Sequence, residues 1–550
     1  MKYSITQRWV AAVCMFAAMG SAASATSPVH GGIPMMHVFD QSGFVPQILY
    51  VPSRLPPLLV SPPLTVSGES IRTVDMGLQT PIVFNVHYSG ASASLDVSAD
   101  AKLFTGAPAI VQLDAEDFQV TLNTSDRLPA DSYKGVVWFR MCSESPCVNP
   151  IATTTRNLIL SVRWVNPGEW ETFQRDARHD GYVPVAIRPS AIRSAWEWQR
   201  TTTSSDVMTG INAVVSSGGR VFVSDDTYFG MASIRALNEA TGSQLWHWDF
   251  SVPAMNPPAV SGNSVYVATT GHEQTFLYAF DVADGSPKFQ ASFDSQWPHV
   301  LAPTVAAGIV YTNGGYYGGG VYAYDANDGL SLWSAFSGDD DMTTPAVADG
   351  NVYYYDGAGL KVYDAFSGTT LASIADPYGP AQAYSYHGAP ILGSPDKVTA
   401  FSGGAFSGRA SSDVEQYDSR ILLNFSIASQ SVRWRTASLY KTQPAVANGV
   451  VYAGGNNPKS FDAISEATGK VLWNWVPNPT DTTFHRNVVV TRNLAFVSTD
   501  QAVYAIDLVS HKPVWSWPTP GSISISGDGY LFIAEGATQS NGHLHAFKVY

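Results

Sequence analysis

The side chains whose chemistry stands out in the sequence are three histidines and an aspartate triplet. Imidazole nitrogens could bind a transition metal if the fold brought the histidines together. Three successive carboxylates could bind Ca²⁺, which prefers oxygen ligands. Because the sequence sets no distance between these groups, separate surface histidines and a solvated acidic turn are the simpler interpretations. The histidines are His299, His387 and His485, and the aspartates are Asp339, Asp340 and Asp341.

Two of the three cysteines lie close together in the motif Cys-Ser-Glu-Ser-Pro-Cys, as Cys142 and Cys147. In an oxidising compartment this pair is expected to form a local disulfide, which stabilises a short loop by about 2 kcal/mol. A metal site would need further thiols or a nearby imidazole, and the motif contains neither. Walker loops, dinucleotide-binding glycine motifs, His-Glu-x-x-His and Gly-x-Ser-x-Gly do not stand out elsewhere.

The first 25 residues have the pattern of a secretory signal peptide. Lys2 and Arg8 precede a short apolar stretch, Val10 to Met19, and Ala23-Ser-Ala25 has the small-x-small pattern of a cleavage site. We therefore expect an exported protein of the periplasm or cell surface. Residues 26–63 are rich in proline and predict an extended arm, because proline lacks the N–H that a strand ladder needs.

Composition favours short strands and tight turns. Charged residues make up 14% of the chain and aromatic residues 12%, and there are 46 glycines. The formal net charge is −14 and the sequence has no basic run, so a nucleic-acid partner is not expected. No segment after the signal peptide is long and apolar enough to span a membrane.

Residues 64–166 predict a small antiparallel sandwich. Runs of strand composition at 81–88, 135–140 and 157–164 are separated by clusters of turn residues. The stretch Leu128–Gly135, followed by the strand that carries the cysteine pair, resembles immunoglobulin-like modules of bacterial surface proteins. The resemblance implies a spacer or packing domain, with ligand binding as the alternative.

From Trp170 to the C-terminus the sequence is dominated by a repeat of about 40 to 44 residues, the length of one four-stranded propeller blade. Four copies have a Pro-x-Val phrase, beginning at Pro258, Pro303, Pro345 and Pro444, each followed by a Gly-containing turn and a Val-Tyr strand. A second turn, typically of the form Asp-x-x-x-Gly, ends one strand before the next strand brings a tryptophan. Asp can cap such a turn and Gly can adopt its positive φ. Ala372 replaces the aromatic residue in one copy. The periodic tryptophans are expected to pack neighbouring blades rather than to bind a ligand; they are Trp196, Trp246, Trp333, Trp434, Trp473 and Trp515.

This combination resembles the tryptophan-docking repeat of pyrroloquinoline-quinone (PQQ) dehydrogenases and of a periplasmic propeller scaffold in outer-membrane protein assembly. The resemblance implies an all-β fold in which residues 167–550 form an eight-bladed propeller. Ser524–Tyr550 ends before an outer strand, whereas Ala195–Trp198 has the pattern of an outer strand with no blade before it. Joining the two would close the ring and leave no unpaired edge.

The resemblance to quinoproteins implies a Ca²⁺ site of carboxylate and amide ligands near the axis, a catalytic aspartate and, in several members, adjacent cysteines. The mature sequence has no adjacent cysteines, and no such ligand set aligns convincingly with the blades. We therefore expect a non-catalytic scaffold without a cofactor. The alternatives are a PQQ- and Ca²⁺-dependent dehydrogenase and a carbohydrate-binding surface adhesin.

The loops before each inner strand are polar and varied, and in a propeller they would converge on one rim of the channel. Their mixed aromatic and polar composition suits a protein or envelope component, including polysaccharide. The sequence does not determine an oligomeric state. The candidate rim residues are Asn212, Asn256, Trp297, His299, Asp341, His387, Gln443, His485 and Arg486.

Overall fold

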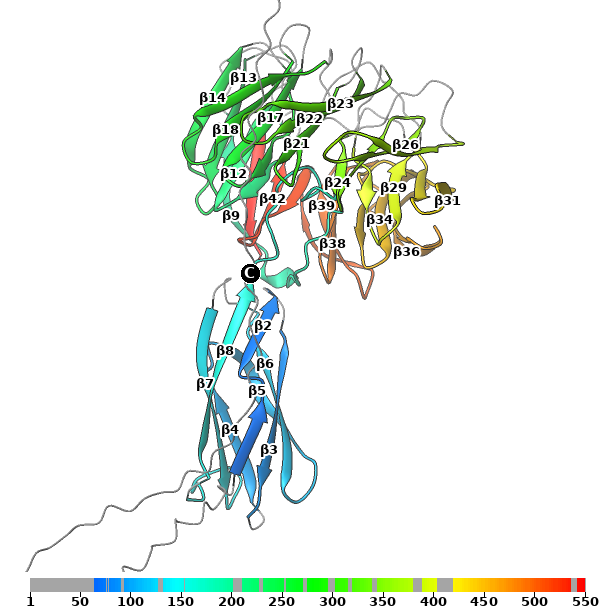
Figure 1. Cartoon of the computed structure of the whole chain (residues 1–550). Coiled ribbons are helices and arrows are strands. Elements are labelled where there is room, and N and C mark those ends of the chain that lie inside the picture. The colour runs from blue at the N-terminus through cyan, green and yellow to red at the C-terminus, as the bar shows by residue number, and fades with distance from the viewer. Residues whose placement is uncertain are drawn as a thin grey trace, which may run out of the picture. The chain divides into compact units, whose positions relative to one another are not determined.

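The structure is a computed structural model of the whole chain (Figure 1). It describes residues 64–549 apart from short internal gaps, so the predicted signal peptide and proline-rich arm lie outside the described residues. None of the described residues belongs to a helix of the length and apolarity needed to cross a membrane. The gaps are 76, 78, 91–92, 127–131, 153, 201–209, 227–230, 252–253, 271–274, 295–301, 315–318, 339–343, 379–387, 403–418 and 536–541.

The first folded part consists of two four-stranded sheets that enclose one apolar core. Alternate residues of its strands face that core, as Ile82, Phe84 and Val86 do in β3. The predicted disulfide between Cys142 and Cys147 is present, with 5.5 Å between the two Cα atoms. The predicted sandwich of two sheets is present, but one of its strand pairs is parallel rather than antiparallel: β2 (Ile71–Asp75) runs parallel to β8 (Arg156–Val165). The immunoglobulin-like assignment stays a prediction. The sheets are β1 (Leu64–Gly68), β3 (Pro81–Tyr88), β6 (Asp117–Thr124) and β5 (Phe104–Gln112), and β2 (Ile71–Asp75), β8 (Arg156–Val165), β7 (Ser132–Cys142) and β4 (Ser94–Ala99).

The described residues beyond 192 form eight further sheets of four or five strands, which follow one another in chain order (Figure 1). Each sheet is an antiparallel meander and is one blade of a β-propeller, numbered here in chain order. In the part of the chain that the structure describes, regular structure outside the strands is one turn of 3₁₀ helix, η1 (Pro189–Ala191). Blades 1 to 4 are β10 (Gly210–Ile211), β11 (Val215–Ser217), β12 (Arg220–Asp226), β13 (Met231–Asn238) and β14 (Gln244–Ser251); β15 (Ala254–Met255), β16 (Ala259–Ser261), β17 (Ser264–Thr270), β18 (Phe276–Asp281) and β19 (Pro287–Ser292); β20 (Thr304–Ala306), β21 (Ile309–Gly314), β22 (Gly319–Asp325) and β23 (Ser331–Gly338); and β24 (Ala346–Ala348), β25 (Asn351–Tyr355), β26 (Gly359–Asp364) and β27 (Thr370–Ala375).

The eighth blade joins the two ends of the propeller. Its outer strand is β9, which pairs with β43 so that Trp196 lies opposite Ala546 and Glu197 opposite His545. The predicted closure, in which the Trp196 segment completes the C-terminal blade, is therefore present. Blades 5 to 8 are β28 (Ile391–Leu392), β29 (Lys397–Phe401), β30 (Leu422–Ser426) and β31 (Ser431–Arg435); β32 (Leu439–Tyr440), β33 (Ala445–Ala447), β34 (Val450–Asn457), β35 (Lys459–Ser465) and β36 (Val471–Trp475); β37 (Phe484–Val490), β38 (Leu494–Thr499), β39 (Val503–Asp507) and β40 (Pro513–Trp517); and β41 (Ser522–Ile525), β42 (Tyr530–Ala534), β43 (His543–Lys548) and β9 (Arg193–Gln199).

The repeated tryptophans dock on the turn of the following blade. Trp333 of blade 3 donates its indole N–H to the carbonyl of Ala365 in blade 4 at 3.0 Å. A Cβ added to Gly368 of that turn would lie 2.6 Å from the Trp333 ring, so the ring rests directly on the glycine. Trp196, Trp246 and Trp434 make the same indole bond to the next blade, at 2.7, 3.0 and 2.8 Å. The tryptophan and the glycine of the repeat are therefore two halves of one contact between blades.

The irregular copies of the repeat follow from this contact. Blade 4 has Ala372 at the aromatic position, and the turn of blade 5 that it faces has Gln430 where other copies have glycine. Blade 7 has His511 at the glycine position, and its imidazole stacks on Trp473 of blade 6 with 4.3 Å between ring centroids. A flat ring can thus replace the bare backbone of glycine as the surface on which the indole packs.

Alanine at Gly368 is expected to destabilise the protein more than alanine at Gly350 in the same blade. Both glycines have positive φ, 68° and 76°, so the backbone strain of the two substitutions is similar, about 1–2 kcal/mol. A Cβ at Gly350 meets nothing within 4 Å, whereas one at Gly368 would clash with Trp333. We expect G368A to lose a further 1–3 kcal/mol or so by overpacking, measured by denaturant titration. Equal losses in the two variants would contradict the docking contact.

Candidate functional site

The propeller has two different faces. In blades 1, 3, 4 and 6 the hairpin between the first two strands is a two-residue turn with positive φ at both positions, as in Asp349-Gly350 (52° and 76°) and Asn448-Gly449 (51° and 76°), the conformation of type I′ turns. Because the strands alternate in direction, these hairpins and the Asp-x-x-x-Gly turns lie on one face, called here the turn face. The longer and more variable connections lie on the opposite face, called here the loop face.

The channel axis is occupied by the chain itself. Residues 169–187 are called here the axial segment. They accept hydrogen bonds of 2.7–3.0 Å from the inner strands of successive blades, in chain order. The accepting and donating residues are Trp170 and Ser216, Glu171 and Val260, Ala177 and Val347, Arg178 and Leu392, Asp180 and Val446, and Gly181 and Val490. Each bond runs from an inner-strand N–H to a carbonyl of the axial segment. The Thr172 hydroxyl supplies the bond to blade 3 by donating to Pro303 at 2.7 Å. The inner edges of seven blades are therefore satisfied by one short segment.

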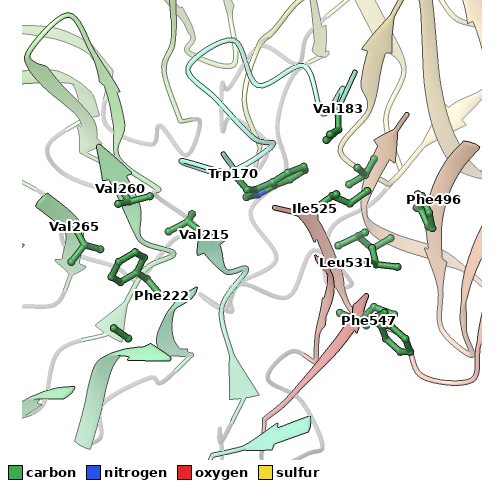
Figure 2. Packing of buried hydrophobic residues seen from close by; sticks show 14 of the residues in the cluster. Trp170, Val183, Val215, Phe222, Val260, Val265, Phe496, Ile525, Leu531 and Phe547 are labelled. Atoms are coloured by element: carbon green, nitrogen blue, oxygen red, sulfur yellow. The ribbon is translucent and has the colours of Figure 1, made fainter. Parts of the chain in front are cut away.

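Trp170 is the apolar centre of this arrangement. Its side chain is 2% exposed and belongs to a core shared by inner strands of blades 1, 2, 7 and 8. Figure 2 shows the indole between Val215 and Val260 on one side and Ile525 and Val183 on the other. Trp170 therefore belongs to the axial segment, and its indole does not take part in the docking contacts of the repeat.

Two buried polar side chains anchor the axial segment. Gln174 donates to the carbonyls of Pro444 and Val488 at 2.9 and 3.1 Å, and it accepts a bond from Asn487 at 2.7 Å. His179 is fully buried, and its Nε2 lies 3.0 Å from the Thr304 hydroxyl. Burial lowers the pKa of His179, although carbonyl contacts oppose the shift, so the imidazole is neutral at pH 7.

The axial segment also holds a buried carboxyl group. Burial, helped by the neighbouring charge of Asp176, raises the pKa of Asp180 to about 6. Asp176 and Asp180 each accept a bond from the N–H two residues ahead, at 2.9 Å. This is the pattern of an Asx turn, and it is the local sequence signal that could have indicated a coiled, non-strand segment here.

The described members of the predicted rim lie beneath the surface. The exposed fractions of Asn212, Asn256, Gln443, His485 and Arg486 are 1%, 1%, 3%, 1% and 6%. Asn212 donates to the carbonyl of Met255 in blade 2 at 3.1 Å, and Gln443 donates to that of Ala389 before blade 5 at the same distance. These contacts tie neighbouring blades together, so a ligand-binding role for the five residues stays a prediction. Trp297, His299, Asp339, Asp340, Asp341 and His387 lie outside the described residues.

The described amides near the axis take part in hydrogen bonds that hold the propeller together. The amide nitrogens of Asn212, Asn256, Gln443 and Asn487 donate to carbonyls within or between blades. The space between the inner strands on the turn-face side is filled by Trp170 and its neighbours. The one group of three metal-ligating side chains that could share an ion among the described residues is Glu197, His543 and His545, on the two outer strands of blade 8.

The loop face is described most completely at blades 6 and 7. The connection from Val476 to Thr483 is held by polar contacts: Asp481 accepts from Tyr504 at 3.0 Å, and Thr483 accepts from Asn456 at 2.6 Å. Val476 projects from this connection with 61% of its surface exposed. A connection fixed in this way loses little conformational entropy when it binds a partner.

A family model described as outer membrane protein assembly factor BamB matches residues 186–296 and 297–517, which is more than half of the chain. The chain belongs to this family. The BamB-family match covers the repeats identified in the sequence, and it confirms a β-propeller protein of PQQ-like repeats. It does not distinguish a scaffold from a dehydrogenase.

Among solved structures, this BamB-family chain is similar to BamB from Moraxella catarrhalis, with 13% identity, 65% of this chain and 97% of that one covered, and a TM-score of 0.46. It is also similar to the quinohemoprotein alcohol dehydrogenase of Comamonas testosteroni, with 14% identity, coverage of 70% and 81%, and a TM-score of 0.48.

Curated relatives include tetrathionate hydrolase of Acidianus ambivalens, 28% identical over 243 residues, and the serine/threonine-protein kinase AfsK of Streptomyces griseus, 29% identical over 199 residues. These matches cover 43% and 33% of this chain. The chain spans 39% and 23% of the length of the two relatives.

Proposed function

We propose that this protein is an exported, non-catalytic scaffold that binds a protein component of the cell envelope through the loop face of its propeller. The observation that supports the proposal best is the axial segment, because the chain itself occupies the axis on the turn-face side. The buried amides under the predicted rim hold blades together, which suits a rigid binding platform. The signal-like N-terminus and the BamB family support an envelope location.

The ordered connection at blades 6 and 7 supports the loop face as the contact surface. Its polar anchors fix the backbone, and Val476 offers exposed apolar surface above them. Exposed apolar side chains on a rigid support, surrounded by polar groups, are typical of protein-binding surfaces.

A photocrosslinking side chain at position 476 tests this proposal in the producing cell. The matched control is position 509, because Val509 is also exposed (86%) but lies in the turn between β39 and β40 on the turn face. We expect a discrete protein adduct from position 476 and little from position 509. Adducts at both positions alike, or at position 509 alone, would contradict a loop-face partner.

A second measurement separates the scaffold from the enzyme. Purified protein is mixed with pyrroloquinoline quinone and Ca²⁺, and the bound quinone is measured by its absorbance after gel filtration. We expect no stoichiometric quinone and no dye-linked alcohol or sugar oxidation. Stoichiometric uptake of the quinone together with oxidation would contradict the scaffold and show that the protein is a dehydrogenase.

A further inference from the structure

Two histidines and two glutamates gather on the sheet that closes the ring. His543 and His545 are alternate residues of β43, so their side chains leave the same face of blade 8. Glu197 lies opposite His545 on β9, and Glu535 follows β42. One ligand atom from each of Glu197, His543 and His545 lies within 4.8 Å of the others. The cluster thus joins residues more than 300 positions apart in the chain.

The hydrogen bonds orient one ring nitrogen of His545 toward the middle of the cluster. Its Nε2 lies 2.8 Å from the Glu535 carboxylate, which accepts the Nε2 proton. In the neutral imidazole the other nitrogen, Nδ1, then has a free lone pair. That nitrogen faces Glu197 Oε2 at 3.8 Å, too far for a hydrogen bond. A lone pair that faces a carboxylate oxygen is unfavourable unless a metal cation or a proton lies between them.

We propose that Glu197, His543 and His545 bind one divalent cation of the zinc class, and that Glu535 orients His545 from behind. Imidazole nitrogen and carboxylate oxygen are ordinary Zn²⁺ ligands, and three of them leave a fourth position for water. Bonds of about 2.0–2.1 Å in tetrahedral geometry place ligand atoms roughly 3.3 Å apart. His543 Nδ1 lies 2.7 Å from Glu197 Oε1, a hydrogen bond that the cation would replace, and His545 Nδ1 lies 3.8 Å from Oε2 of the same carboxylate, so small side-chain shifts would bring the ligand atoms to this spacing.

The surroundings of the cluster suit a bound ion. A carboxylate behind a ligating imidazole is a usual outer-shell partner, because it sets the tautomer and raises the basicity of the ligand. The side chains of His545 and Glu535 are 10% and 17% exposed, and the Trp517 ring of blade 7 lies 5.6 Å from the His545 ring. Glu197 is 53% exposed, which leaves a path from solvent to the cluster. The two carboxylates also balance the charge of a divalent cation.

The bound cation would fasten the closure of the propeller. β9 and β43 come from opposite ends of the propeller sequence, and their pairing is the seam of the ring. A ligand that binds the folded state alone stabilises it by mass action: at 100 times Kd it lowers the unfolding equilibrium constant about 100-fold. Zinc should therefore raise the midpoint of thermal unfolding as well as bind.

The test uses the full mature chain, stripped of metal with a chelator and then titrated with Zn²⁺. We expect one zinc per chain by elemental analysis after dialysis, and a higher unfolding midpoint with zinc than with chelator. H545Q and H543Q should lose both effects. The matched control is H247Q, because His247 pairs with Asp249 on the outer strand of blade 1 at 3.6 Å without a second imidazole nearby. H247Q should bind zinc and respond to it as the wild type does.

Two outcomes would overturn the proposal. In the first, H545Q retains the same zinc content as the wild type, which would place the metal elsewhere. In the second, the wild type binds no zinc at one equivalent and melts alike in zinc and chelator; the cluster would then be a set of proton-mediated ion pairs. Because binding is measured on folded protein at low temperature, a loss of stability in H545Q does not obscure the result.

Discussion

Replacing Trp170 by alanine is expected to lower the free energy of unfolding by about 3–5 kcal/mol, the range found when a large buried side chain is truncated. The indole is 2% exposed and lies where inner strands of four blades meet (Figure 2). Its removal would leave a cavity on the axis that the surrounding hydrogen-bonded strands cannot fill. The measurement is the shift in the denaturant midpoint of the propeller transition, because a chain of several parts need not unfold in two states.

The control for this prediction is Trp248 on the outer strand of blade 1. Its side chain is 39% exposed and contacts Phe280 and Arg235, with 5.6 Å between ring centroids and 5.5 Å from guanidinium to ring. W248A is expected to cost about 1 kcal/mol. If W170A unfolded at the same midpoint as the wild type, the axial segment could not be part of what holds the blades together.

Replacing Glu239 by glutamine is expected to stabilise the protein at alkaline pH. Glu239 is 1% exposed, and burial raises the pKa of its carboxyl to about 8, with further upward contributions from Asp528 and Glu169. Ser526 and Lys548 act in the opposite direction. The folded state therefore holds a proton on Glu239 that the unfolded chain has released above its ordinary pKa of about 4.3. Stability is lost as the pH rises from there to about 8.

The glutamine side chain cannot ionise, so the variant should not lose stability in this way as the pH rises. We expect E239Q to exceed the wild type by about 3–5 kcal/mol at pH 9, by less at pH 7, and by little at pH 5. Denaturant titrations at the three pH values give the comparison. Parallel stability profiles of the two proteins would show that the carboxyl is not held neutral in the fold.

The corresponding turn of blade 6 supplies a matched control, for which the expected change in stability has the opposite sign. Glu466 occupies the position of Glu239 in its repeat and is also fully buried. It accepts bonds from the backbone N–H and the hydroxyl of Ser394, at 2.9 and 2.5 Å, and lies 3.9 Å from the Lys397 ammonium. E466Q should therefore destabilise the protein by about 1–3 kcal/mol, since hydrogen bonds to a charged acceptor are weakened.

The repeats made the propeller predictable, because each copy carries both halves of one packing contact. Trp333 and Gly368, one blade apart, illustrate how a periodic indole and a periodic glycine specify the docking of neighbouring sheets. The closure through the Trp196 segment was predictable for the same reason, since an outer strand without a blade and a blade without an outer strand are complementary. Even the substitution of Gln430 for glycine follows from the missing aromatic residue at Ala372.

The axial segment could not be predicted, because six of its bonds to the blades are accepted by backbone carbonyls that any residue carries. Nothing in the side chains of residues 169–187 repeats with the period of the blades, although the segment contacts seven of them. The described candidate rim residues illustrate a related difficulty, although their binding role stays a prediction. Asn212 and Gln443 have the polarity of surface ligands, but their amides satisfy buried carbonyls of neighbouring blades. Polarity alone does not distinguish a ligand-binding residue from a buried residue that hydrogen-bonds to a neighbouring blade.

The Glu197 cluster was missed for a different reason. His543 and His545 lie near the C-terminal end of the propeller, but their partner Glu197 lies more than 300 positions earlier in the chain. A pairwise register between β9 and β43 is needed to bring them together. The predicted closure already pairs these two segments, so a search for metal ligands across the β9–β43 pair would have found the cluster.

The axial segment has a consequence for how the protein is made. Its backbone carbonyls and the Thr172 hydroxyl bond to blades 1 to 7 in the same order in which those blades follow along the chain, and the segment itself comes before all of them. During synthesis from the N-terminus, every new sheet finds its hydrogen-bond partner already made, so the ring can grow on a template before the last blade exists. Assembly becomes sequential and local, and only the final joining of β9 to β43 must bridge the full length of the propeller.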